Sequence, residues 1–335
     1  MRRLIGSIND TMSTVLEQAT SRRYPVAIVG AGSIGTAFAV VHALAGRDVR
    51  LYDVAAEALD NARSRLDQIL ADLAHFGLLE EAPAEVAARV QTSSDLAEAL
   101  AGVAVIHECA PENLEIKQAV TIEIDRLAPP HAAIASASSA IPASEYARAV
   151  AGRSRCLVAH PGNPPYLLRV VEIVPAPFTD ASVVRLVESF LEAAGLACVI
   201  VRRELRGFVF NRLQGALLRE AYCLVRDGVA SVEEIDAIVR GGLGLRWSVV
   251  GPFETVDLNT RGGIERHASI LGPAYAAMGA ERGQFDPWTD ELIGSVTAQR
   301  RAQLPLERWE ERVRWRDREL MRLLAARRSF SDSEC

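Results

Sequence analysis

The chain has 335 residues, of which 49% are hydrophobic and 24% charged, and its formal net charge is −6 at pH 7. This balance is typical of a globular protein with one large or two average domains. The negative charge argues against a nucleic-acid partner held by bulk electrostatics. No stretch approaches the roughly 20 apolar residues that a membrane span needs. The five cysteines are scattered without metal-ligand or redox spacing, which favours reduced thiols, no metal site and a cytoplasmic location.

The first part of the chain alternates short apolar runs with helical patterns. Residues 1–24 lack the apolar core of a secretory signal peptide and are interpreted as an N-terminal extension. From residue 25 to 204 the alternation predicts an α/β fold with a doubly wound parallel sheet. We expect strands at 26–29, 49–52, 103–107, 132–136, 155–159, 168–174 and 197–201, and helices at 34–45, 56–78, 113–127 and 180–194.

From residue 205 to 328 the pattern becomes helical throughout, which predicts an all-helical C-terminal domain. Its first element is a long amphipathic helix that ends near Gly228. The next helix begins after Ser231, with Glu234 three residues later, which is the spacing of a capping box. Residues 329–335 are interpreted as a flexible tail.

A glycine loop follows the first expected strand. Gly30, Gly32 and Gly35 fit the pattern G-x-G-x-x-G. Gly30 suits the tight turn, Gly32 the close approach of a pyrophosphate, and Gly35 close packing of helix on strand. Ser33 and Ile34 stand at the start of the helix, where main-chain N–H groups hold phosphates. A glycine-rich turn without a ligand is the alternative.

An acidic residue ends the second expected strand. Asp53 lies 23 residues after Gly30, where the carboxylate accepts hydrogen bonds from an adenosine ribose and repels a 2′-phosphate. Together with the glycine loop this predicts that residues 25–204 form a Rossmann-like domain that binds NAD rather than NADP.

The stretch AHPGNPPYLLRVVEIV, residues 159–174, contains a carboxylate in an apolar run. A buried carboxylate is costly unless it is paired or hydrogen-bonded. His160 is twelve residues before Glu172, and two strands joined through the proline-rich turn can bring them side by side. An imidazole oriented by a carboxylate is suited to act as a general base on a secondary alcohol. The alternatives are an ordinary core histidine and a glutamate that faces water.

Seven segments together resemble the L-3-hydroxyacyl-CoA dehydrogenase superfamily, and most closely its branch with lambda-crystallin and L-gulonate 3-dehydrogenase. The resemblance extends from about residue 25 to 325. It implies that His160 is the general base and that Glu172 orients it. The segments are VGAGSIG, HECAPENLEIK, SASS, AHPGNPPYLLRVVEIVP, GFVFNRLQ, GLGLRWSVVGPFETVDLN and WRDRELMRL.

The same resemblance implies roles for four further residues. Ser138 and Asn211 would hydrogen-bond the reacting hydroxyl or carbonyl, and Ser139 could take the role of its neighbour. Glu112 and Lys117 would lie near the nicotinamide ribose. Lys117 is the only lysine of the chain, and Asn is mildly unfavourable inside a helix.

The surface expected to meet the substrate is acidic. In hydroxyacyl-CoA enzymes the helix after the second strand typically offers lysine or other polar contacts to coenzyme A. Here this segment carries six carboxylates against Arg63 and Arg65, a poor match for several phosphates. A small carboxylate would instead use one arginine in bidentate geometry. Arg246 is the first candidate and Arg169 the second, and each could instead be a structural or exposed charge.

These observations predict an NAD-dependent dehydrogenase that oxidises the 3-hydroxyl of a small L-3-hydroxy acid similar to L-gulonate. A short-chain hydroxyacyl-CoA substrate is one alternative. A non-catalytic NAD-binding, crystallin-like protein is another, and a structural assembly module a third. Gly162 and Arg169 depart from the close relatives and argue against L-gulonate itself. The apolar helical region predicts a homodimer.

Overall fold

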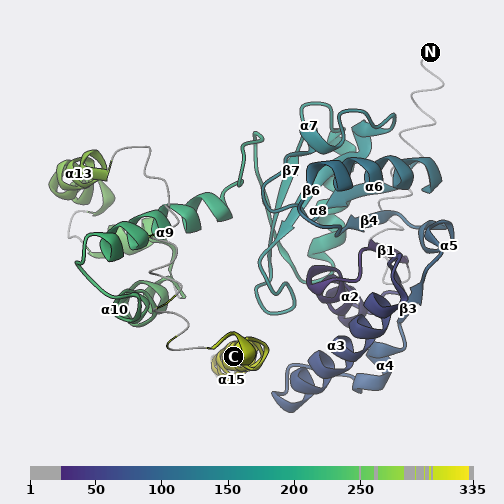
Figure 1. Ribbon diagram of the computed structural model, residues 1–335, viewed down its shortest axis with the longest axis horizontal. Helices are drawn as coiled ribbons and strands as arrows, with labels where there is room; N and C mark the ends of the chain where they lie inside the picture. The colour runs from purple at the N-terminus through teal and green to yellow at the C-terminus, as the bar shows by residue number, and fades with distance from the viewer. Residues whose placement is uncertain are drawn as a thin grey trace. The chain divides into compact units, whose positions relative to one another are not determined.

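The structure is a computed structural model. It describes residues 24–248, 250–259, 263–282, 291, 298, 302 and 305–331. The chain divides into two compact units (Figure 1). One contains the described residues up to Asn211 together with those from Arg314 onward, and the other extends from Arg212 to Val313. Apart from Tyr24, the predicted N-terminal extension lies outside the described residues.

The first unit is built on an eight-stranded sheet in the order β3-β2-β1-β4-β5-β6-β7-β8. Within it only β6 and β7 pair antiparallel. The predicted α/β class and doubly wound sheet are confirmed, with this one antiparallel pair at the proline-rich turn. The strands are β1 (Val26–Val29), β2 (Val49–Tyr52), β3 (Val90–Ser93), β4 (Val105–Glu108), β5 (Ala133–Ser136), β6 (Cys156–Pro161), β7 (Val170–Pro175) and β8 (Ala197–Ile200).

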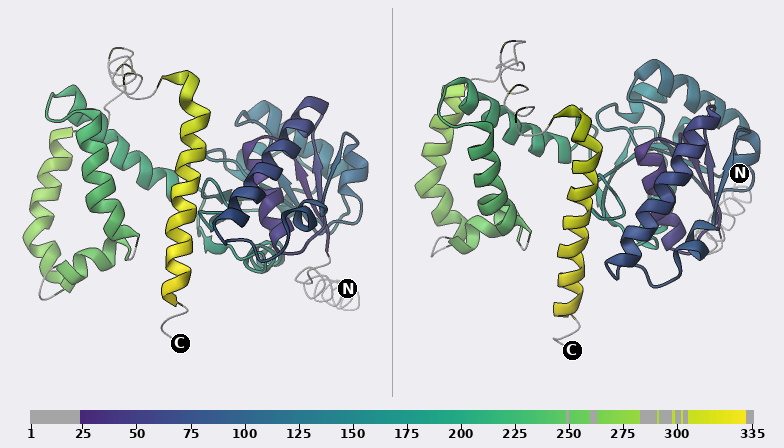
Figure 2. Two further views of the ribbon diagram at one scale, coloured as in Figure 1. Left: turned by 90° about the horizontal axis from the view of Figure 1, so that it is seen from below. Right: turned by 60° about the horizontal axis from the view of Figure 1, so that its bottom comes forward.

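Helices cover both faces of this sheet (Figure 1 and Figure 2). One hydrophobic cluster joins the sheet to α2, α3 and α8, and a second joins the opposite face to α5, α6 and α7. The helices are α2 (Ser33–Leu44), α3 (Ala56–His75), α4 (Pro83–Ala87), α5 (Leu96–Leu100), α6 (Leu114–Leu127), α7 (Ala143–Tyr146) and α8 (Ala181–Glu192), with a 3₁₀ turn at Arg153–Arg155.

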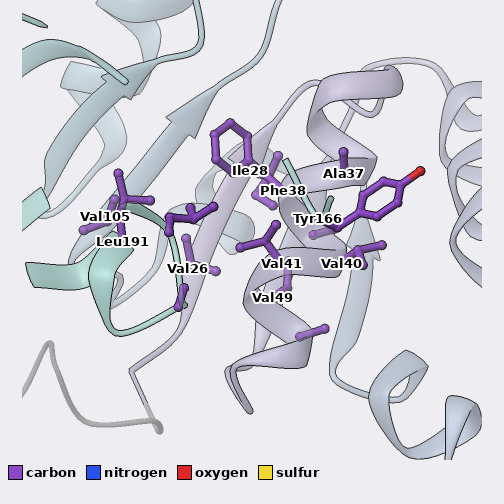
Figure 3. Packing of buried hydrophobic residues seen from close by; sticks show 14 of the residues in the cluster. Val26, Ile28, Ala37, Phe38, Val40, Val41, Val49, Val105, Tyr166 and Leu191 are labelled. Atoms are coloured by element: carbon purple, nitrogen blue, oxygen red, sulfur yellow. The ribbon is translucent and has the colours of Figure 1, made fainter. Parts of the chain in front are cut away.

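Strand β1 is buried on both faces, which explains its continuous apolar sequence. Val26 and Ile28 belong to the cluster with α2, where Phe38 is also fully buried (Figure 3). Ala27 belongs to the cluster on the opposite face. The C-terminal end of β1 and the start of α2 are therefore fixed from both sides, and the glycine loop lies between them.

The second unit is helical, as predicted. The capping box of α10 is present, with the Ser231 hydroxyl and the Glu234 carboxylate each bonded to the other's main-chain N–H. The helical elements are α9 (Phe210–Arg226), α10 (Val232–Ile238), a π-helical turn (Val239–Gly244), α11 (Leu245–Trp247), α12 (Pro252–Asn259), α13 (Gly263–Arg282), a 3₁₀ turn (Leu306–Arg308) and α15 (Trp309–Ser331).

The C-terminal part of α15 belongs to the first unit, whereas the sequence assigns it to the helical domain. Tyr166 donates to Asp317 over 3.1 Å, and Met321 is buried in the cluster with α2 and α3. The helix continues to Ser331, into the stretch predicted as a tail, and residues 332–335 lie outside the described part. Across the described residues, no helix is both long and apolar enough to traverse a bilayer.

Candidate active site

The glycine loop has the geometry that a dinucleotide requires. Gly30 has φ +111°, and a Cβ there would lie 2.7 Å from the carbonyl oxygen of Cys109. A Cβ on Gly35 would collide with the Gly30 carbonyl. In contrast, a Cβ on Gly32 would meet nothing within 4 Å, so this side of the loop is open. Gly32 is the N-cap of α2 without a side-chain cap, so N–H groups of the first turn are available to a phosphate.

Asp53 is held against this loop. Its Oδ2 accepts from the N–H of Ala31 over 2.8 Å, and its Oδ1 accepts from the N–H of Ala55 over 3.0 Å. The carboxylate therefore stands at the C-terminal end of β2 beside the open glycine turn. These residues fit the phosphates and the adenosine ribose of NAD.

His160 and Glu172 are direct neighbours in the antiparallel pair of β6 and β7. The Nδ1 atom of His160 lies 2.7 Å from Oε2 of Glu172, and the residues are only 7% and 5% exposed. The apolar run therefore tolerates its carboxylate because the histidine faces it.

The second oxygen of Glu172 holds the start of α9. Oε1 accepts from the N–H groups of Val209, over 2.7 Å, and Phe210, over 3.0 Å. Burial acts to raise the pKa of Glu172, but the bonds from His160 and these amides outweigh it, so the pKa lies below its ordinary value. Since an ionised carboxylate only accepts, the Nδ1 atom of His160 carries a proton and donates it to Glu172, and Nε2 is not engaged by this contact.

Two phenylalanines enclose the imidazole. Its ring centroid lies 5.7 Å from that of Phe208 and 6.0 Å from that of Phe210. Phe208 is fully buried with φ +46°, and it follows Gly207, whose φ is +76°. This left-handed pair turns the chain into α9 directly beside the histidine. The aromatic contacts and Glu172 together restrict the ring to one orientation.

Ser138 and Glu112 form a second cluster. The Ser138 hydroxyl donates to Oε1 of Glu112 over 2.7 Å and accepts from the N–H of Ile141 over 2.8 Å. Oε1 also accepts from the N–H groups of Ser139, over 3.0 Å, and Ala140, over 2.9 Å. Burial acts to raise the pKa of Glu112, but these bonds and the charge of Lys117 lower it overall.

Asn211 connects the two clusters. Its Nδ2 donates to the carbonyl oxygen of Ser139 over 2.8 Å, while the two preceding residues donate to Glu172. Three consecutive residues at the start of α9 thus tie the histidine pair to the loop of residues 138–141. These contacts link His160, Glu172, Ser138, Asn211 and Glu112, and the functional roles of these residues stay a prediction.

Lys117 is buried on α6, with only 1% of it exposed. Its Nζ donates to both oxygens of Glu108, over 3.0 and 3.2 Å, and to the carbonyl oxygen of Ala110 over 3.1 Å. Oε2 of Glu112 is 3.8 Å away. Glu108 is fully buried and also accepts from Ser136. The contact between Lys117 and the cofactor stays a prediction.

Sequence reasoning missed Glu108. The signal was available, because Glu108 ends an apolar run and, like Glu172, needs a partner there. The chain's only lysine, nine residues later on α6, is that partner.

The two predicted substrate arginines take part in none of the contacts described for these clusters. Arg246 is exposed on α11, in the second unit. Arg169 is exposed just before β7, and its Nη1 donates to the carbonyl oxygen of Ala194 over 3.4 Å. None of the contacts described for His160 or Glu172 involves either arginine. A substrate role for them stays a prediction.

Comparison with known families matches both units. Residues 25–205 match the NAD-binding domain of 3-hydroxyacyl-CoA dehydrogenase, and residues 207–303 match its C-terminal domain. The chain belongs to the 3-hydroxyacyl-CoA dehydrogenase family. It is an NAD-dependent dehydrogenase that acts on secondary alcohols, as predicted.

Individual relatives in this family differ in what they act on. The chain is 38% identical over 234 residues to a lambda-crystallin homolog of Bos taurus, covering 68% of this chain and 72% of the relative. It is 39% identical over 228 residues to an L-carnitine dehydrogenase of Streptomyces coelicolor, covering 68% and 70%. A solved NAD⁺-dependent dismutase, 5-formyl-3-hydroxy-2-methylpyridine 4-carboxylic acid 5-dehydrogenase, is 27% identical with a TM-score of 0.77, covering 91% and 97%.

The glycine loop yields a matched pair of expected results. Gly32→Ala should fold normally, because its Cβ meets no protein atom, yet bind NADH at least about tenfold more weakly, because the Cβ occupies the side where the pyrophosphate approaches. Gly35→Ala should lose both stability and NADH binding. Fluorescence titration with NADH and thermal unfolding measure the two effects. A Gly32→Ala variant with unchanged affinity would contradict this reading of the loop.

Proposed function

We propose that this enzyme oxidises the 3-hydroxyl of a small L-3-hydroxy acid to the 3-keto acid, with His160 as the general base. The observation that carries the proposal is the 2.7 Å contact between His160 Nδ1 and Glu172 Oε2, because it leaves Nε2 to accept the hydroxyl proton. The glycine loop and Asp53 would hold NAD, which would supply the hydride acceptor for C3. Glu172 fixes the tautomer of the imidazole and stabilises its positive charge after proton transfer.

Ser138 and Asn211 complete the proposed machinery. Ser138 belongs to the loop of residues 138–141, and its hydroxyl is bonded to Glu112. Asn211 donates to the Ser139 carbonyl of the same loop, and Val209, two residues earlier, donates to Glu172. We assign Ser138 and Asn211 to hydrogen bonds with the reacting oxygen, which positions its proton toward Nε2. Positioning of this kind lowers the entropic part of the barrier.

The surface of α3 supports a free acid over a coenzyme A ester. Arg63 donates to the carbonyl oxygens of Ala87 and Val90, and Arg65 to the Thr36 hydroxyl over 3.4 Å. Both arginines of this segment are thus engaged with the protein itself. Exposed carboxylates remain at Glu57, Asp60, Asp67 and Glu80. The similarity to an L-carnitine dehydrogenase agrees, since carnitine is a free 3-hydroxy acid.

A panel of NAD-dependent oxidations tests this proposal. It contains L-gulonate, L-3-hydroxybutyrate, L-carnitine and L-3-hydroxybutyryl-CoA, each followed by NADH absorbance. We expect kcat/KM to be highest for one of the free acids. A strong preference for the coenzyme A ester would overturn the substrate class and favour the alternative hydroxyacyl-CoA activity. No turnover with any of the four would favour the crystallin-like alternative.

We further propose that the enzyme is a homodimer formed through the helical unit. Among the residues of this unit whose burial the structure describes, only Cys223, Val232 and Thr255 are buried, while many large hydrophobic side chains are exposed. A second copy of the chain is the partner that would cover the remaining apolar surface. The exposed large hydrophobic residues are Leu213, Leu218, Val229, Ile238, Leu245, Trp247, Phe253, Leu258, Ile270, Leu271, Tyr275 and Met278.

Sedimentation equilibrium is expected to give twice the chain mass of 36.3 kDa. Phe253→Asp should shift the particle toward the monomer, because its side chain is 77% exposed within the helical unit. Ile122→Asp is the control, since Ile122 is 46% exposed on α6 of the sheet unit. A 36.3 kDa particle for the unmodified protein would remove the proposal.

We also propose a cytoplasmic location. Cys109, Cys156 and Cys198 carry free thiols, and a reducing compartment favours that state.

A further inference from the structure

One oxygen of Glu112 occupies a ring of donors at the end of β5. Oε1 accepts from the Ser138 hydroxyl over 2.7 Å and from the N–H groups of Ser139 and Ala140 over 3.0 and 2.9 Å. The N–H of Ile141 lies 3.3 Å away and is shared with the Ser138 hydroxyl. We call this set of donors, from Ser138 to Ile141, the 138–141 nest.

The 138–141 nest is suited to any carboxylate oxygen. Successive main-chain N–H groups that converge on one point form an anion-binding concavity, and hydrogen bonds to a charged acceptor are stronger than those to a neutral one. Its occupant here is a carboxylate that the chain itself supplies. Outside the nest, Oε2 of Glu112 has the Lys117 ammonium 3.8 Å away, and the side chain is 39% exposed. The Glu112 side chain is therefore partly exposed to solvent while its Oε1 is held in the nest.

The nest adjoins the proposed base. Asn211 donates to the carbonyl oxygen of Ser139, within the nest segment, and the two residues before it donate to Glu172, which binds His160. In a 3-hydroxy acid, one carbon, C2, separates the hydroxyl-bearing C3 from the carboxylate, so both groups can engage neighbouring donors. A ligand with its hydroxyl at the Ser138 side could thus present its carboxylate to the adjacent amides.

We propose that the 138–141 nest is the carboxylate subsite of this enzyme, and that Glu112 occupies it as an internal substitute when substrate is absent. The inference rests on the proposed function, because it assigns the acid group of the same 3-hydroxy acid. Substrate binding then exchanges one carboxylate for another in the nest, so no donor is left unpaired. A thioester carbonyl carries no charge and competes poorly with Glu112, which makes the nest a selectivity element for free acids.

The test measures binding without turnover. The probe is L-3-hydroxybutyrate, titrated calorimetrically into the full-length enzyme without nucleotide. Glu112→Ala should bind the acid about tenfold more tightly or better, because the apparent affinity rises as the internal competitor is removed. The methyl ester of the same hydroxy acid should gain less than twofold, because it has no charge to exchange with Glu112.

Glu115→Ala is the matched control. Glu115 is an exposed carboxylate in the first turn of α6, three residues from Glu112, and it makes none of the described nest contacts. Removing Glu115 changes the local charge by the same amount as removing Glu112. If Glu115→Ala gained a comparable affinity for the acid, general electrostatics would explain the effect, and the subsite proposal would be overturned. A loss of acid binding in Glu112→Ala would also overturn it, because it would make Glu112 a support of the site rather than a competitor.

Glu112→Gln decides the matter if the alanine variant unfolds. Glutamine keeps an acceptor in the nest but lacks the charge, so acid affinity should rise severalfold, and unchanged affinity overturns the proposal. Because no oxidation is measured, the result is separable from the proposed function. If none of the panel substrates is oxidised, the binding result still stands. If free acids are oxidised but neither Glu112 variant gains affinity for the acid, only the subsite proposal is removed.

Discussion

Replacing His160 with alanine is expected to lower kcat by about 10²- to 10⁴-fold, which is the usual contribution of a general base. Of the side chains that enclose the imidazole, Phe208 and Phe210 cannot accept a proton. The pKa of Glu172 lies below its ordinary value because His160 and two main-chain N–H groups bond to it, so Glu172 is a weaker base. Affinity for NADH should change little, because the glycine loop and Asp53 lie on other strands. Steady-state NADH formation and fluorescence titration measure the two quantities.

His75→Ala is the control for this variant, since His75 is exposed at the end of α3. It should retain full kcat. If His160→Ala keeps most of its turnover, the base is a different group and the proposed mechanism is wrong.

Replacing Lys117 with methionine is expected to lower the free energy of unfolding by about 3–5 kcal/mol, the usual cost of removing one partner of a buried ion pair. The variant leaves Glu108 fully buried without its counterion. It also removes the donor to the Ala110 carbonyl, so the segment that carries Glu112 loses its anchor. Urea unfolding at pH 7 measures the loss.

The double variant Glu108→Gln/Lys117→Met separates charge from packing. It should recover part of the stability, because a buried glutamine costs less than an unpaired carboxylate. A Lys117→Met variant that loses less than about 1 kcal/mol would resemble an exposed pair and contradict this account.

The parts of the site predicted from sequence are those fixed by local geometry. The glycine spacing dictates a turn between strand and helix, and Gly30 and Gly35 have no room for a Cβ. His160 and Glu172 are twelve residues apart on the two strands of one hairpin, and the antiparallel register places them opposite each other. In both cases neighbouring residues along the chain decide the outcome.

Strand β3 was not predicted because its sequence, VQTS, lacks a hydrophobic run. It pairs with β2 at the edge of the sheet, where Gln91 and Thr92 are exposed. An edge strand contacts fewer neighbouring residues, so its sequence lacks the run of apolar residues by which central strands are recognised.

A buried basic cluster also escaped sequence analysis because its members come from distant segments. Arg47 can only donate, so Nδ1 of His42 accepts from it over 3.2 Å. Nε2 of His42 therefore carries a proton and donates to Nε2 of His107 over 2.9 Å. Burial, with a smaller effect from Arg47, lowers the pKa of His107 to about 3. Only the packing of α2 on β4 brings these residues together.

The central claim is that His160 and Glu172 act as one catalytic unit. A double-mutant cycle of His160→Ala and Glu172→Gln, with kcat measured on the best free acid, tests it most directly. Each single variant should be strongly impaired, and Glu172→Gln should add little further loss once His160 is absent. Losses that multiply in the double variant would mean that Glu172 acts independently of His160, and would contradict the account.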